Sequence, residues 1–351
     1  MAEDIFSQFY NLFNNDDEVN WKLAEQISQH ILKDEDETFI LEDEENKTNI
    51  ESIFRAVQMN LEQNLSEKGI ESKIIDLKLL NKKEWSLWFM ESSKHFDFSS
   101  LDTSSVNLPV NIGNIKSAVI GMQLGNVAGG LAKYSWGIST TGIILPQSKT
   151  LAVNHENLYK RINSLDIDRK KAIFAVLALE YITLSLGKFS EPLTKLINVL
   201  NKSTNKLLGE IEKLNTEIDI ETTDINKIME NFSENNEINF ENIFDDLFAP
   251  LSFYREGIIF LAKENAGLDD PSIFDVIIDS SIGEYQDNAF TQLNSKINQF
   301  SEHSRKFILY LYESKNPNTI VDILRSSELI PSEEELIDPI SWAARTSLPP
   351  I

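Results

Sequence analysis

The chain has 351 residues, and its 56 acidic and 32 basic residues give a formal net charge of -24. A surface of this charge repels phosphates and anionic lipids, so nucleic acids and membranes are not expected partners. Hydrophobic residues make up 41% of the chain and charged residues 25%, which is typical of a globular protein with a large core. The absence of cysteine excludes disulfides, thiolate metal sites and cysteine nucleophiles.

We expect the first residues of the given sequence not to act as a targeting signal. The first residues, 1–6, lack a basic start and a continuous apolar run, so we expect a cytoplasmic protein. Apolar residues then recur at helical spacing, which predicts an N-terminal helical region over residues 1–100. A polar, serine-rich stretch follows at 99–106 and separates this region from a second unit, residues 106–346. We expect the two to form one compact body.

A glycine-rich helix and a hairpin are predicted next. From Ile115 onward, Gly121, Gly125 and Gly129 recur every four residues, and small residues on one helical face allow another backbone to approach closely. Residues 142–153 contain two apolar runs on either side of a Pro-Gln-Ser-Lys turn, which predicts a β-hairpin. A weaker alternation of apolar residues at 70–77 indicates a strand.

The segment from Asp166 to Gly187 predicts the central helix of the fold. Asp166 or Asp168 can cap its start, and Gly187 can end it. Nearly every position between them is apolar, and a helix that is apolar all round must be surrounded by protein. The segment is too short and too interrupted by Glu180 to cross a membrane. We therefore expect a buried helix carrying one carboxylate, next to the hairpin.

Further helices are predicted in the C-terminal half. They cover residues 251–266, a single long helix over 284–312, and a short terminal helix over 338–345. Ser332 followed by Glu335 fits a capping box, in which each side chain bonds the backbone of the other. The predicted fold class is mainly α, with one small β element.

Glu180 can be compared with the catalytic glutamate on the zinc-binding helix of zinc peptidases. Zinc peptidases place His-Glu on a buried helix and a second His four residues after the first, so that both imidazoles bind zinc and the glutamate activates water. Here Leu179 and Thr183 occupy the two histidine positions. A lone buried glutamate is most simply held by a cation or by hydrogen bonds. His155, which follows the predicted hairpin, could approach the helix, although a lone loop histidine is more often a surface residue.

Five separated stretches, in order along nearly the whole chain, resemble the actinobacterial zincin-like metallopeptidase family associated with coenzyme F-420 biosynthesis. They are residues 19–24, 81–85, 121–125, 251–257 and 330–345.

This resemblance implies a zincin-like helical domain in which Glu180 matches the general base. Leu179 and Thr183 stand where the family has two zinc-binding histidines. A later Glu-Gly-His segment of the family reads Glu256, Gly257 and Ile258 here, so the third histidine is also missing. Leucine and isoleucine have no lone pair, and a neutral threonine hydroxyl is a poor zinc ligand. The resemblance thus implies a degenerate member without a cofactor, whereas active relatives hold zinc.

Three functions remain open from the sequence. The first is a non-catalytic relative of a metallopeptidase that binds a peptide or protein in the former cleft, lined by Glu256 and His155. The second is an active hydrolase with non-standard ligands. The third is a structural or assembly protein without a cleft function. The sequence names neither the substrate, the partner nor the oligomeric state.

Overall fold

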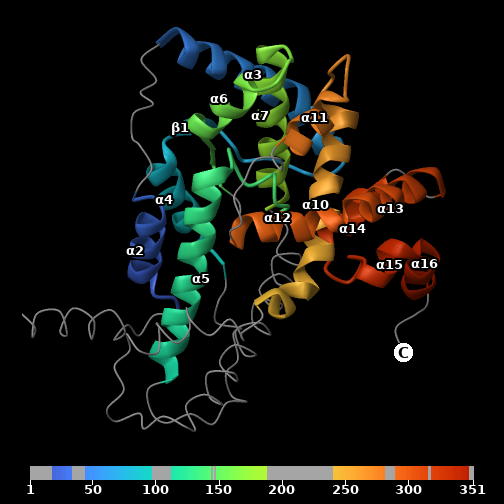
Figure 1. Cartoon of the computed structure of the whole chain (residues 1–351). Helices are drawn as coiled ribbons and strands as arrows, with labels where there is room; N and C mark the ends of the chain where they lie inside the picture. Colours follow the sequence, from blue (N-terminus) through green and yellow to red (C-terminus); the bar gives the residue numbers. More distant parts are fainter. Residues whose placement is uncertain are drawn as a thin grey trace, which may run out of the picture.

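The computed structural model describes most of the chain, in these ranges: 18–33, 44–96, 112–143, 145, 148–187, 240–280, 289–314 and 318–347. Within them the fold is mainly α with a small parallel sheet of two strands (Figure 1), which confirms the predicted class. In these ranges no helix has the length and apolar character needed to cross a membrane.

Side-chain caps define the N-terminal helices. Helix α2 spans Trp21–Ile31, and the Asn20 side chain accepts a hydrogen bond from the Leu23 amide. Helix α4 spans Lys82–Ser93 and begins with a capping box between Asn81 and Glu84. Between them, α3 spans Glu44–Glu67. Residues 1–17 of the predicted N-terminal helical region lie outside the described ranges.

Helix α5, Ile112–Tyr134, carries the glycine stripe, and α2 packs along it. A Cβ atom added to Gly125 would lie 2.5 Å from the carbonyl oxygen of Ala24, and one added to Gly129 would lie 2.9 Å from the Ile31 side chain. Distances this short are not tolerated without a shift of the neighbouring atoms. The stripe is therefore a contact surface between two helices of the same chain, as its spacing predicted.

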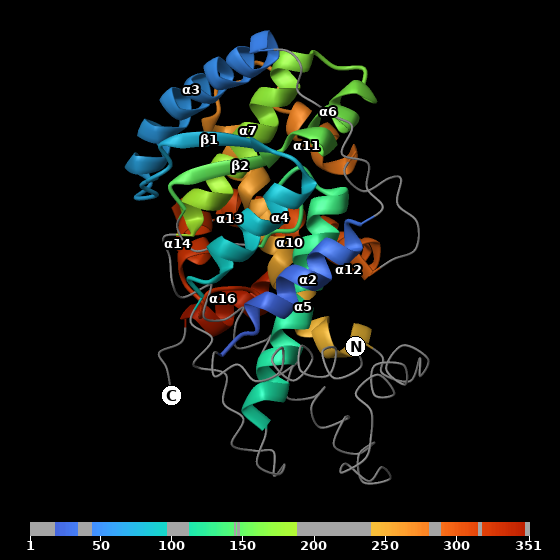
Figure 2. The ribbon, with the colours of Figure 1, turned by 90° about the vertical axis from the view of Figure 1, so that its left-hand side faces the viewer.

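The β-hairpin prediction is wrong. Strand β2, Thr150–Asn154, pairs in parallel with β1, Asp76–Leu80, from which α4 and α5 separate it in the sequence. Figure 2 shows the two strands side by side. Leu145 packs instead against the end of the central helix, where its carbonyl oxygen touches Gly187. The second apolar run of the predicted hairpin does form a strand, β2, but the pattern could not identify its partner, which lies far away in sequence.

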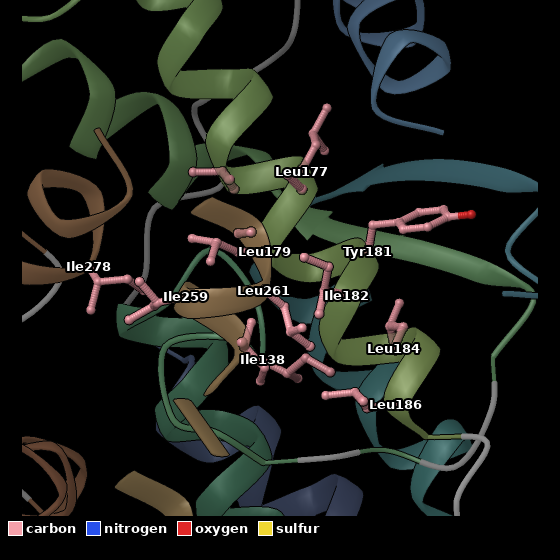
Figure 3. Close-up of a cluster of buried hydrophobic side chains, with 14 of the residues drawn as sticks. Ile138, Leu177, Leu179, Tyr181, Ile182, Leu184, Leu186, Ile259, Leu261 and Ile278 are labelled. Atoms are coloured by element: carbon pink, nitrogen blue, oxygen red, sulfur yellow. The ribbon is translucent and has the colours of Figure 1, made fainter. Parts of the chain in front are cut away.

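The predicted central helix is α7, Arg169–Leu186. The Asp168 side chain caps its start by accepting a hydrogen bond from the Lys171 amide, and Gly187 is its C-cap. Every side chain from Ala172 to Leu186 is buried, including Glu180. Figure 3 shows how its apolar side chains pack among those of α10 and α11. The all-round burial inferred from the sequence is confirmed.

Helices α10, Phe240–Asn265, and α11, Ile273–Ser280, pack on α7. The single helix predicted over 284–312 is wrong within the described part, because α12, Ala289–Gln299, and α13, Ser301–Ser314, are separate. At the break the Phe300 amide donates to the Ile297 carbonyl in a tight turn. The apolar pattern continues through the break because both helices pack on α10.

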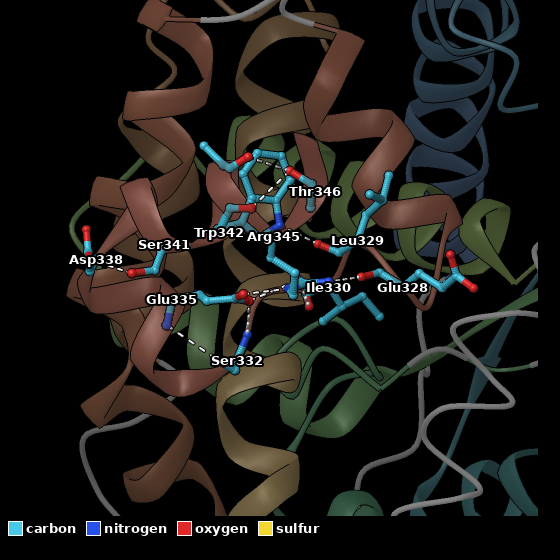
Figure 4. Close-up of polar contacts among 11 residues, drawn as sticks. Glu328, Leu329, Ile330, Ser332, Glu335, Asp338, Ser341, Trp342, Arg345 and Thr346 are labelled. Carbon is cyan, nitrogen blue, oxygen red and sulfur yellow. Dashed lines mark hydrogen bonds and ion pairs between the residues drawn. The ribbon is translucent and has the colours of Figure 1, made fainter. Parts of the chain in front are cut away.

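Three short helices complete the described chain: α14, Asn318–Arg325, α15, Glu333–Ile337, and α16, Pro339–Ser347. The predicted capping box between Ser332 and Glu335 is present. Arg345 connects α16 to α15, since the Arg345 guanidinium donates to both oxygens of Glu335, at 2.5 and 2.9 Å (Figure 4). The same side chain donates to the carbonyl oxygens of Glu328 and Ile330.

Candidate functional site

Glu180 lies on α7 and is 1% exposed. Among the residues that the structure describes, the partners of its carboxylate lie in a loop, and none of them is a cation. The backbone amides of Ile138 and Ser139 each donate to it at 3.0 Å, one to each oxygen. The Ser139 hydroxyl donates a third hydrogen bond at 2.5 Å. A buried glutamate was expected to be held either by a cation or by hydrogen bonds, and the structure shows hydrogen bonds.

The loop that holds Glu180, residues 135–142, joins α5 to the segment before β2 and is buried throughout. Buried backbone groups need partners, and side chains supply them here. The Ser135 hydroxyl donates to the Gly137 carbonyl at 2.6 Å, and the Asn157 amide donates to the Ser135 carbonyl at 2.7 Å. Gly137 itself lies against the carboxylate, so that a Cβ atom there would overlap the Glu180 carboxyl group. The loop at 135–142 is therefore folded around the carboxyl group of Glu180, which reaches it from α7.

Burial raises the pKa of Glu180 from 4.5 to about 7, because a charged carboxylate is disfavoured away from water. The hydrogen bonds from Ser139 and from the Ile138 amide oppose this rise, since they stabilise the charged form. A carboxyl group of this pKa changes its charge near neutral pH. Such groups are found at catalytic sites and also in buried structural networks.

The short contact between Ser139 and Glu180 has the geometry of a nucleophile and its base. Ser139 and Glu180 are each 1% exposed, however, and two backbone amides already bind the carboxylate. A substrate carbonyl would need to reach the serine oxygen through the packed loop. This arrangement suits a structural clamp better than acyl transfer.

The two histidine positions of a zinc helix are filled by packing groups. Leu179 is fully buried and lies on the side of α7 that faces α10 (Figure 3). Thr183 is also fully buried, and its hydroxyl donates to the Leu179 carbonyl at 2.7 Å. The hydroxyl hydrogen of Thr183 is thus used within α7. Neither side chain fits the donor set that a zinc ion needs.

Glu256 and Ile258 lie on α10 and do not complete a metal site with Glu180. Glu256 is buried and binds two arginines, Arg305 at 2.7 Å and Arg255 at 3.4 Å. Ile258 is fully buried in the core. Throughout the described ranges, no group of three or more His, Asp or Glu residues is arranged to hold a metal ion. The residues present at the expected zinc position therefore do not fit zinc.

His155 belongs to a third, separate group. It is the first residue of α6, His155–Asn163, and its Nδ1 lies 2.8 Å from the Leu80 carbonyl at the end of β1. It is 6% exposed, so the expectation of a surface histidine is wrong. The structure places Glu180, Glu256 and His155 in three different hydrogen-bond networks.

Sequence reasoning missed two features of this region. The first is the loop at 135–142 that binds Glu180. The available signal for it was its content of serine, threonine and glycine between two buried elements. The burial of Arg255, beside the singled-out Glu256, had no signal at all, since a charged residue on a helix is expected at the surface.

The comparisons with known proteins found a structural relative. The fold resembles the crystal structure of a protein from Chloroflexus aurantiacus described as a "putative hydrolase with a novel fold", with a TM-score of 0.59. The match covers 95% of this chain and 100% of the relative, at 14% sequence identity. No protein-family model and no curated protein matches the chain. At this identity the similarity establishes a shared fold, and the zincin-like assignment stays a prediction.

Proposed function

We propose that this chain is a non-catalytic relative of zinc-dependent, metallopeptidase-like hydrolases. The observation that carries the proposal is the state of Glu180. A general base must reach a water molecule, but here the carboxylate accepts three hydrogen bonds from residues 138 and 139. The substitutions at Leu179, Thr183 and Ile258 support the same conclusion, because they remove every histidine of the expected ligand set.

The hydrolase part of the proposal is supported by the fold. The structural match extends over nearly all of both chains, and the relative is described as a "putative hydrolase with a novel fold". A scaffold can persist after its chemistry has been lost, since the fold depends on packing and the activity on a few side chains. In this chain the core around α7 is complete, and Glu180 contributes to it as the anchor of a buried loop.

The packing also bears on what the protein binds. A peptide in the former cleft would need space beside Leu179 and Thr183, and both side chains are fully buried. This favours an assembly or interaction protein whose partner binds elsewhere, over a peptide receptor at the former active site. An active hydrolase with other ligands is less well supported, because Glu180, Glu256 and His155 take part in separate networks.

A zinc-dependent stability measurement tests the proposal. The variant combines Leu179→His, Thr183→His and Ile258→His, and the control is Leu179→His alone, which leaves the site incomplete. We expect zinc to raise the melting temperature of the triple variant only, since binding to the folded state adds stability.

Each other outcome contradicts part of the proposal. A zinc-dependent rise in the parent chain would show that ligands for zinc survive, and the non-catalytic assignment would fail. If the triple variant folds and zinc leaves its melting temperature unchanged, these positions do not form a zinc site, and the descent from a metallopeptidase is refuted.

A further inference from the structure

Arg255 is an unusual residue of the core. It lies on α10, is 1% exposed, and is among the largest fully buried side chains. Its Nη2 donates to the Ser301 hydroxyl and to Glu256. Its Nε and Nη1 are also buried, and within the described part of the chain they have no hydrogen-bond acceptor. Buried donors without partners are costly, and in native proteins they usually meet a water, an ion or a ligand.

The second observation is the helix end beside this guanidinium. Ser301, which accepts a hydrogen bond from Arg255, is the first residue of the 14-residue helix α13. The amides of a first helical turn have no acceptors within the helix, and the helix dipole places partial positive charge there. Arg255 therefore adds a full positive charge, with free donors, at a point that already favours an anion.

The carboxylates around Arg255 do not use all of its donors. Glu256 is the buried counterion, but its two oxygens are shared between Arg255 and Arg305. Arg305 is 42% exposed, so the buried part of this group is one guanidinium and one carboxylate, and Glu256 reaches only Nη2 of Arg255. Asp279 also lies 3.5 Å from Arg305, but its side chain is 62% exposed and water screens it. The buried donors Nε and Nη1 of Arg255 thus still need acceptors, which a ligand with two oxygens can supply.

We propose that Arg255 and the first turn of α13 form a binding site for a small carboxylate anion. A carboxylate has one charge and two acceptor oxygens, which suits a guanidinium with unused donors. Arg305 shares the Glu256 carboxylate with Arg255 and is 42% exposed, so the site lies close below the surface. The net charge of -24 makes non-specific accumulation of anions unfavourable, so that saturable binding reports on a specific site. The site is independent of the proposed loss of zinc chemistry.

Thermal unfolding in sodium acetate, sodium phosphate and sodium chloride, at equal ionic strength and pH 7, tests the proposal. We expect acetate to raise the melting temperature of the parent chain with a saturable dependence on concentration. Arg255→Met should weaken this acetate effect at least about tenfold, because it removes charge-assisted hydrogen bonds. Arg305→Gln is the matched control, since it changes the same Glu256 network but keeps the free donors, and it should retain the effect.

Several results would overturn the site. They are stabilisation by phosphate alone, no stabilisation by either anion, or an equal acetate effect in Arg255→Met. If Arg255→Met does not fold, the Nε–H resonance of the slowly exchanging, buried arginine in the ¹⁵N-labelled parent decides the question. A saturable shift of that resonance with acetate supports the site, and an unchanged resonance refutes it.

Discussion

Replacing Glu180 by glutamine should change how the stability of the protein depends on pH. In the folded chain the pKa of Glu180 is raised from 4.5 to about 7 by burial. Below about pH 4.5 both the folded and the unfolded chain hold the proton. Above it the unfolded chain releases the proton while the folded chain keeps it, so the unfolding free energy falls until about pH 7. A pKa difference of this size corresponds to a loss of about 3 kcal/mol.

Glu180→Gln removes this titration. In either orientation of the new amide, its NH₂ group would face a backbone amide of residue 138 or 139, which adds an offset of about 1–3 kcal/mol that does not vary with pH. The unfolding free energy of the parent, measured against that of the variant, should therefore fall by about 3 kcal/mol from pH 4.5 to pH 7.5. Above about pH 7.5 the difference should no longer change, because Glu180 of the parent is then charged in both the folded and the unfolded chain.

Urea unfolding followed by circular dichroism at several pH values measures this difference. The control is Glu51→Gln, which makes the same change in net charge at an exposed position of α3. It should leave the pH dependence of the parent unchanged. If the difference between the parent and Glu180→Gln is constant from pH 5 to pH 8, the buried carboxyl group does not titrate as argued, and the reasoning is refuted.

Three other substitutions test the packing. Gly125→Ala should destabilise the chain by about 1–3 kcal/mol, because the new Cβ would overlap the backbone of α2. Asn126→Ala, on the exposed side of α5, is the control and should have little effect. Equal melting temperatures of the two variants would contradict the close approach of α2 and α5. Arg345→Lys should increase amide hydrogen exchange in α16, because a lysine cannot make the two hydrogen bonds that Arg345 makes to Glu335. Unchanged exchange would show that these two bonds do not hold α16 in place. Thr183→Val should change the unfolding free energy by less than about 1 kcal/mol, since it removes one local hydrogen bond and keeps the shape; a larger loss would indicate a further partner of the hydroxyl.

Local patterns predicted the elements whose causes are local. The caps at Asp168 and Ser332 and the all-round apolar character of α7 are properties of consecutive residues, and the structure confirms them. The partner of β2 could not be predicted in the same way. An apolar strand can pair with any free edge, and here it pairs with a strand about 75 residues earlier.

The candidate site was predictable only in part. The sequence placed one carboxylate in a buried helix, and elementary electrostatics required a partner for it. Which partner it takes depends on the path of the loop at 135–142, and loop geometry is not encoded in a periodic pattern. The buried Arg255 shows the same limit, because it binds Ser301 at the start of α13, and the apolar periodicity does not reveal that a helix starts there.

The metal content of the purified protein tests the central claim most directly. The claim is that the zinc site expected beside Glu180 has been replaced by packing, with Leu179, Thr183 and Ile258 fully buried. Elemental analysis after dialysis against a weak chelator should find zinc far below one ion per chain. A content of about one zinc ion per chain, retained through dialysis, would contradict the claim, because zinc held that firmly requires a built set of ligands.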